Sequence, residues 1–305
     1  MERLYAVALL CASAPLPAQS PPATLAQATT PADDLAFLDA EDRMTVPVQI
    51  AGVGPFAFII DTGAQRSVIS RQLAVRLGLP AGPRVRLVAV TGTSAVNTVI
   101  VPSLSVSTLG ARRIEAPALE AQHLGAPGIL GIDSLQDHAL TIDFDRQRMT
   151  VMPAVGRKPP RRESDEIVVR ARSLFGQLVV TDATVAGRRV RVVLDTGTSV
   201  SLGNLALRRL LSRGRPGEAA VFTSVLGEQM RADYAFLPEM TLGSAKIHAL
   251  PVAFADAPPF AAFGLETKPA LLLGMDALRL FRRVHIDFAR RELRLLLPRD
   301  ARRAG

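Results

Sequence analysis

Two aspartates stand in the same setting at two points of the chain, and together they could hydrolyse an amide bond. Each follows an apolar run and opens an Asp-Thr-Gly tripeptide, Asp61 in FIIDTGA and Asp195 in VVLDTGT. Two carboxylates around one water divide the acid and base roles, because like charges about 3 Å apart cannot both ionise. Neither tripeptide has an obvious second acid beside it. The pattern predicts that Asp61 and Asp195 meet and share one water.

The chain repeats itself around these two turns. Three landmarks recur in the same order: the Asp-Thr-Gly turn, an apolar run into Gly-x-Asp (GILGID and LLLGMD), and a later strand containing Ile-Asp-Phe. Asp61 and Asp195 are 134 positions apart, and Gly131 and Gly274 are 143 positions apart. Such a repeat indicates a duplicated domain whose second copy carries a modest insertion.

Alternating apolar and polar residues, as in Val46–Ile50, predict that each copy is mostly β-structure. A short amphipathic helix is predicted at residues 71–77, and another before Gly214. Short polar residues often begin such helices, because their side chains accept hydrogen bonds from free backbone amides. Glycines often end them, because glycine readily takes the left-handed conformation found there. Helix caps are predicted at Gly78, Asn204, Gly214, Asp133 and Asp276.

These residues resemble the retropepsin-like aspartic proteases, in the single-chain form with two tandem domains found in bacteria. That family carries a D-T/S-G-A/T/S turn and a later apolar-apolar-Gly stretch that packs under it. The resemblance covers about residues 43–298. It implies an all-β fold of two acid protease β-barrel lobes related by a pseudo-two-fold, with short helices. The matching segments are Asp61–Ala64 with Ile129–Gly131, and Asp195–Thr198 with Leu272–Gly274.

The resemblance implies an aspartic endopeptidase, a hydrolase of peptide bonds in which Asp61 and Asp195 are the catalytic dyad. It makes Thr62 and Thr196 an interlobe hydrogen-bond lattice. Gly63 and Gly197 allow tight turns and close backbone approach. The two turns differ at one place, where Thr198 offers a hydroxyl group and Ala64 offers none. We hypothesise that Thr198 donates to the Asp195 carboxylate, which makes Asp195 the charged partner and Asp61 the proton carrier.

The family also has a hairpin flap that closes over substrate. Thr91–Thr93 and Leu226–Glu228 lie between strand-like runs where flap tips would fall, and an ordinary hairpin with a glycine is the alternative. Tyr234 follows the second tip. It could bond near the site, or be a half-buried strand tyrosine.

A polypeptide is the expected substrate, and no cofactor is expected. The alternative from another class is a catalytically inactive, exported peptide-binding or scaffold protein of the same fold. A glycosidase would also use paired acids, but the chain has no Trp for sugar stacking. Nucleic acid is not expected despite a net charge of +8, because aromatic residues make up 5% of the chain. No metal is expected, since four histidines lie far apart: His123, His138, His248 and His285.

The N-terminus reads as a secretory signal, with Arg3 before the apolar run Tyr5–Ala14 and with Ala14 and Ala18 as cleavage points. This predicts export to the periplasm or the exterior, no stable membrane span, and a monomer that contains an internal pseudo-dimer. The Pro- and Ala-rich leader is a tether or a regulatory prosegment. The expected segments are a signal at 1–18, the leader at 19–42, domains at 43–153 and 167–298, a linker at 154–166 and a basic tail at 299–305.

Overall fold

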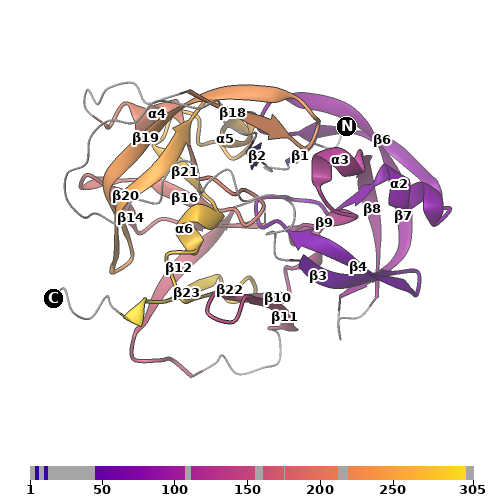
Figure 1. Cartoon of the computed structure of the whole chain (residues 1–305), viewed down its shortest axis with the longest axis horizontal. Coiled ribbons are helices and arrows are strands. Elements are labelled where there is room, and N and C mark those ends of the chain that lie inside the picture. The colour runs from indigo at the N-terminus through magenta and orange to yellow at the C-terminus, as the bar shows by residue number, and fades with distance from the viewer. Residues whose placement is uncertain are drawn as a thin grey trace, which may run out of the picture.

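The computed structural model describes residues 4–6, 10–12, 45–106, 111–154, 161–174, 176–211 and 219–299. The leader at 19–42, most of the expected signal peptide and tail, and residues 155–160 of the linker lie outside these ranges. Figure 1 shows two β-rich lobes side by side, with a further sheet below their junction. Two lobes of β-structure with short helices confirm the predicted fold class. Among the described residues, no helix is both long and apolar enough to cross a bilayer.

The first lobe contains a closed barrel. Its strands run in the order β7-β3-β4-β9-β5-β8, and pairing between β7 and β8 closes the ring. Strand β3 alternates exposed and buried residues, so that Val46, Val48 and Ile50 enter the core. The elements of this lobe are β3 (Thr45–Ile50), β4 (Val53–Ile60), β5 (Val68–Ser70), α2 (Arg71–Arg76), β6 (Ala81–Val88), β7 (Thr93–Val106), β8 (Arg112–Leu119), α3 (Ala121–Leu124), β9 (Gly128–Leu130) and η2 (Ile132–Ser134).

The second lobe repeats this plan within one larger sheet. Its strands follow the order β13-β16-β21-β17-β20-β19-β14-β15, and β18 pairs with β19. The elements are β12 (Glu166–Leu174), β13 (Gln177–Val180), β14 (Ala183–Val185), β15 (Arg188–Arg189), β16 (Arg191–Leu194), β17 (Leu202–Gly203), α4 (Leu205–Arg208), β18 (Ala219–Ser224), β19 (Gln229–Leu242), β20 (Ala245–Phe254), α5 (Pro258–Ala262), β21 (Ala270–Leu273) and α6 (Met275–Leu278).

A sheet built from both halves joins the lobes. Its order is β11-β10-β22-β23-β12, formed by β10 (His138–Asp143), β11 (Arg148–Pro153), β22 (Arg283–Asp287), β23 (Glu292–Leu296) and β12. The halves meet where β10 pairs antiparallel with β22, with Leu140 opposite Ile286. We call these five strands the interlobe sheet. Both of these side chains are fully buried, so the junction of the halves is part of the main core.

The predicted helix ends are partly right. Ser70 caps α2 and Gly78 follows it with a positive φ of 59°, a conformation that suits glycine. Asn204 caps α4, as predicted, through a 2.8 Å bond from Leu207 N. However, α4 ends at Arg208 rather than at Gly214, because the following amides form tighter i→i−3 bonds.

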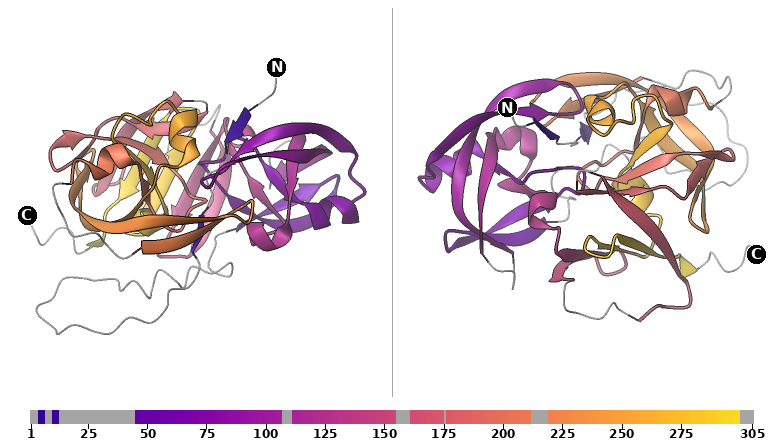
Figure 2. Two further views of the ribbon diagram at one scale, coloured as in Figure 1. Left: turned by 90° about the horizontal axis from the view of Figure 1, so that it is seen from above. Right: turned by 180° about the vertical axis from the view of Figure 1, so that it is seen from behind.

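Two short N-terminal strands lie between the lobes. Strand β1 (Leu4–Ala6) pairs in parallel with β6, and β2 (Leu10–Ala12) pairs antiparallel with β18. The left panel of Figure 2 shows β1 lying over the junction of the lobes. Both strands fall within the expected signal peptide and would leave with it.

Candidate active site

Each Asp-Thr-Gly turn is held by the apolar-apolar-Gly strand of its own lobe. Strand β9 runs parallel to β4, and Asp61 N donates to Leu130 O over 3.0 Å. The second lobe repeats this arrangement, since β21 runs parallel to β16 and Asp195 N donates to Leu273 O over 3.0 Å. The two turns therefore begin at equivalent positions, each at the end of a strand that pairs in parallel with the apolar-apolar-Gly strand.

The structure brings Asp61 and Asp195 together across the junction of the lobes. A Cβ atom on Gly63 would lie 2.6 Å from Asp195 Cγ, and one on Gly197 would overlap the carboxyl group of Asp61. Each carboxyl group is fully buried and rests on the glycine of the opposite turn. Only glycine leaves this space, which explains its position in both tripeptides.

Thr62 and Thr196 bind the two turns to each other. Thr62 Oγ1 donates to Leu194 O and Thr196 Oγ1 donates to Ile60 O, both over 2.8 Å. In return, the amide of each threonine donates to the hydroxyl oxygen of the other over 3.1 Å. The predicted lattice is present, with four bonds that cross between the lobes.

The two carboxyl groups differ in their hydrogen bonds. Asp61 Oδ1 accepts from Gly63 N over 2.8 Å and from Ala64 N over 2.9 Å, whereas Asp195 Oδ1 accepts from Gly197 N over 3.1 Å. Burial, followed by the charge of Asp61, raises the pKa of Asp195 well above its ordinary value, although nearby amides oppose this. One carboxyl group of the pair therefore keeps its proton while the other is ionised.

The hypothesis about Thr198 is wrong. Its hydroxyl group donates to the backbone carbonyl of Asp195 over 3.3 Å, and it makes no bond to the carboxylate. This bond closes the turn locally, as expected for a threonine three residues after an acceptor. The polarity of the dyad inferred from Thr198 therefore loses its structural basis.

Two serine–aspartate pairs, which the sequence analysis missed, brace the turns. Ser67 donates through N (2.9 Å) and Oγ (2.7 Å) to Asp133 Oδ1, and Gly131 N donates to Ser67 Oγ. In the second lobe, Ser201 N and Oγ donate to Asp276 over 3.0 and 2.7 Å.

Asp133 and Asp276 are therefore not the N-caps that we predicted. Gly131 and Gly274 occupy the cap positions of η2 and α6, while the two carboxylates turn back to the serines. Each serine follows the aspartate of its own Asp-Thr-Gly turn by six residues, and this shared offset was a usable signal.

Gln177 joins the lobes at a place where no sequence signal exists. Its side chain is fully buried, and Nε2 donates to Gly63 O over 2.8 Å. Strand β13 of the second lobe thus supports the turn of the first. No repeat relation or motif in the sequence points to it.

The two hairpins after the turns meet at their tips. In the first, Ala89 and Gly92 exchange backbone bonds; in the second, Gly227 N donates to Ser224 O. Thr91 Oγ1 lies 2.8 Å from Ser224 Oγ and 2.9 Å from Glu228 Oε2, within hydrogen-bonding distance of both. The predicted tips therefore lie on hairpins that contact each other.

Tyr234, which follows the second predicted flap tip, lies on a strand of the second lobe. Tyr234 is half-buried on β19 and packs edge-on against Phe236, with ring centroids 6.3 Å apart. Its hydroxyl oxygen makes no hydrogen bond within the described part of the chain.

The described ranges contain no group of three or more His, Cys, Asp and Glu arranged to hold a metal. Asp143 and Asp287 end β10 and β22, and each accepts a bond from the amide three residues later in the turn that follows.

The chain was compared with protein families, curated proteins and solved structures. The profile of the aspartyl protease family matches residues 46–134 and 181–277, together more than half of the chain. Among solved structures, a retropepsin-like aspartic protease from Rickettsia conorii is 20% identical over 43% of this chain and 89% of its own, with a TM-score of 0.31. Basic 7S globulin from soybean is 10% identical over 86% of this chain and 92% of its own, with a TM-score of 0.42.

No curated protein matches the chain. The two matched segments each contain one Asp-Thr-Gly turn and one Gly-x-Asp stretch, the same units that the fold holds around the junction of the lobes. The chain belongs to the aspartyl protease family.

Proposed function

We propose that this chain is an aspartic endopeptidase that hydrolyses peptide bonds with a water activated between Asp61 and Asp195. One observation carries the proposal: two buried carboxyl groups, one from each half, each lie against the glycine of the opposite turn. Family membership supports the same reaction class. Thr62, Gly63, Thr196, Gly197 and Thr198 support the two turns.

We assign the steps from the amide bonds, because Asp61 accepts two and Asp195 accepts one at a longer distance. Ionised Asp61 takes a proton from water while the water oxygen attacks the peptide carbonyl carbon, and Asp195 gives its proton to the carbonyl oxygen. The resulting gem-diol collapses when Asp195 takes back a hydroxyl proton and Asp61 gives its proton to the leaving nitrogen. The C–N bond breaks, and both groups return to their starting protonation states.

An extended polypeptide is the substrate in this proposal. Strands β1 and β2, which belong to the chain's own N-terminus, pair with the hairpin strands β6 and β18. The pairing of β1 with β6 is parallel, and the pairing of β2 with β18 is antiparallel. This is expected if one extended chain passes two hairpin strands that a two-fold axis relates and therefore turns in opposite directions. The hairpin edges thus have backbone groups available for an extended peptide.

The test is cleavage of an unfolded protein by the chain that lacks the expected signal peptide, residues 1–18. Asp61→Asn and Asp195→Asn, assayed separately, should each lower kcat by about a thousandfold or more, because neither carboxyl group can act alone. Thr198→Ala should leave the acidic limb of the pH–rate profile in place. Peptide binding without cleavage by the unmodified chain at any pH from about 4 to about 7 would instead indicate a peptide-binding protein.

A further inference from the structure

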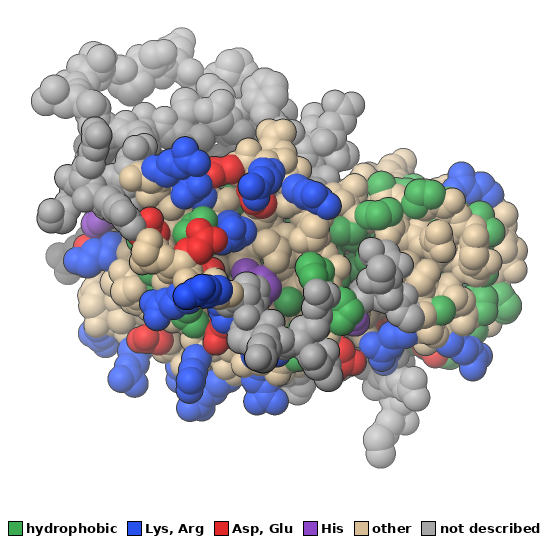
Figure 3. Space-filling model, turned by 90° about the horizontal axis from the view of Figure 1, so that it is seen from below, with side chains coloured by type: hydrophobic (Ala, Val, Ile, Leu, Met, Phe, Trp, Pro, Cys, Tyr) green, Lys and Arg blue, Asp and Glu red, His purple; other side chains and the backbone are tan. Residues whose placement is uncertain are grey.

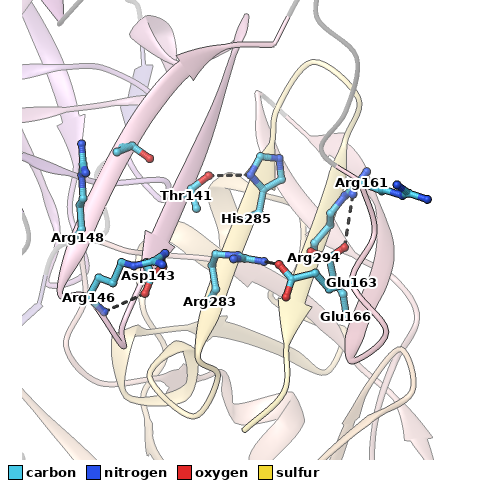
Figure 4. A pocket seen from close by; sticks show the side chains of 11 residues that line it. Thr141, Asp143, Arg146, Arg148, Arg161, Glu163, Glu166, Arg283, His285 and Arg294 are labelled. Carbon is cyan, nitrogen blue, oxygen red and sulfur yellow. Dashed lines mark hydrogen bonds and ion pairs between the residues drawn. The ribbon is translucent and has the colours of Figure 1, made fainter. Parts of the chain in front are cut away.

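A trough rich in arginine crosses the interlobe sheet. It encloses about 530 Å³, and its walls come from both halves of the chain. Figure 4 shows Arg148 at one side, Arg161 at the other, and Thr141 facing His285 between them. We call it the arginine trough and define it by Arg146, Arg148, Arg161, Arg283, Arg294 and His285.

Strand register explains why these side chains gather. Arg148 lies opposite Asp143, which in turn lies opposite Arg283, so the three share one face of the sheet. In the next row, His285 lies opposite Arg294 and hydrogen-bonds Thr141 through Nδ1 over 2.8 Å. The neighbouring residues on these strands point the other way into the core. The trough is thus the polar face of the interlobe sheet.

Positive charge exceeds negative charge in the trough. Five arginines line it with three carboxylates, and the ion pairs among them are Arg146–Asp143 at 3.1 Å, Arg294–Glu166 at 3.5 Å and Arg283–Glu163. Arg148 and Arg161 are exposed and make no hydrogen bond or ion pair within the described ranges.

An adjoining hollow of about 350 Å³ extends the basic surface. It adds Arg299, which is exposed, and Arg282, which pairs with Asp145 at 2.9 Å. Figure 3 shows the lower face of the molecule, where basic side chains outnumber the acidic ones among them. An acidic partner would find several guanidinium groups there, each able to bind a carboxylate with two parallel bonds.

The chain itself contains a matching acidic segment, which ends shortly before β3 in the sequence. Residues 33–42, DDLAFLDAED, carry five carboxylates and no basic residue. They lie outside the described residues, and only residues 43 and 44 separate them from β3. Strand β3 packs beside β11, the strand that carries Arg148, and Figure 1 shows the two strands close together.

The segment is also long enough. Ten extended residues reach about 33 Å. The five strands of the interlobe sheet lie about 4.8 Å apart, so crossing all of them requires about 19 Å. A chain anchored at Thr45 can therefore lie across the whole trough, from the β11 side to Arg161.

We propose that the arginine trough is the docking surface of the chain's own residues 33–42. Asp and Glu of the segment bind Arg148 and Arg161, the two trough arginines that make no ion pair among the described residues. The short tether supports docking, because it keeps the segment at an effective concentration of about 1 mM or more. Cleavage of the signal at Ala14 or Ala18 leaves the segment on the exported protein, so docking persists after export.

Docking can be measured with a fluorescent synthetic peptide of residues 31–42. The receptor is the full chain with its own segment neutralised by Asp→Asn at 33, 34, 39 and 42 and Glu41→Gln. We expect the peptide to bind this receptor about tenfold more tightly than the unmodified chain, whose own segment competes. Raising salt from about 0.05 M to about 0.5 M should weaken the binding, because exposed ion pairs are screened.

Arginine variants identify the surface. Arg148→Gln with Arg161→Gln in the same receptor should weaken peptide binding about tenfold. Arg188→Gln with Arg189→Gln, on β15 at the other end of the strand order from β11, should leave it unchanged. Equal peptide binding by the receptor and the unmodified chain would overturn the proposal, and so would equal losses in the two arginine pairs. Tighter binding of a single-stranded oligonucleotide than of the peptide would also overturn it. None of these measurements depends on proteolysis.

Discussion

The pKa of a buried carboxyl group depends on its burial and on the hydrogen bonds that it accepts. Asp61 and Asp195 occupy equivalent positions, yet the stronger amide bonds at Asp61 make the pair unequal. Asp276 shows the same principle outside the dyad. Its side chain is half-buried, and burial raises its pKa to about 6 even though Ser201 bonds it twice. A group of this kind makes the stability of the whole fold depend on pH.

The sign of that dependence follows from the raised pKa of Asp276. Its contribution to stability is complete below the unfolded value of 3.8 and is lost as the pH rises through about 6. Between about pH 4 and about pH 8, the loss in unfolding free energy is about 2 kcal/mol. Asp276→Asn should remove this part of the pH dependence, as measured by denaturant unfolding across the range.

Asp256→Asn is the matched control for Asp276→Asn, because Asp256 is an exposed aspartate in the same half of the chain. It should leave the pH dependence as it is in the unmodified chain. If Asp276→Asn also leaves the dependence unchanged, the Asp276 carboxyl group does not titrate in this window. The serine bonds would then hold it ionised.

At the scale of elements, what could be predicted depended on repetition. The Asp-Thr-Gly turns, the strands beneath them and the hairpins all occur twice, so each copy supports the reading of the other. The serine–aspartate braces also occur twice, but their function depends on where a side chain turns, and the placement of Asp133 beside a glycine looked like a cap. Gln177 occurs once and acts across the lobes, so no local pattern could indicate it.

The contact between the hairpin tips is a second feature that only three dimensions show. Thr91 of the first hairpin bonds Ser224 and Glu228 of the second, which ties two elements from different lobes. Thr91→Val keeps the shape and removes the hydroxyl group. Losing this bond costs about 1 kcal/mol, which corresponds to about a fivefold rise in KM if closure accompanies substrate binding.

Two measurements check the hairpin prediction. Amide hydrogen exchange should become faster at residues 89–92 and 224–228 in Thr91→Val, and KM should rise with little change in kcat. Thr93→Val serves as the control, since Thr93 is exposed on the same hairpin and its hydroxyl makes no bond within the described residues. Equal effects of the two substitutions would show that the tip contact does not contribute to closure.

At the scale of the whole molecule, duplication gives one chain both halves of a site. The interlobe sheet fixes the lobes below, and the bonds around Asp61 and Asp195 fix them at the centre. Covalent connection also frees each half to differ. Gln177 on one side and the unequal amide bonds of the dyad are differences that two identical chains could not show.

The cross-lobe lattice can be tested as a unit through its two threonines. Thr62→Val and Thr196→Val each remove two bonds between the lobes and should each lower the unfolding free energy by about 2 kcal/mol. The double variant should lose less than the sum, because all four bonds depend on the same alignment of the lobes. Thr62→Ser keeps the hydroxyl group and should retain most of the stability. Strictly additive losses in denaturant unfolding would mean that the two threonines act independently and that the alignment of the lobes comes from the other contacts between them, the interlobe sheet above all.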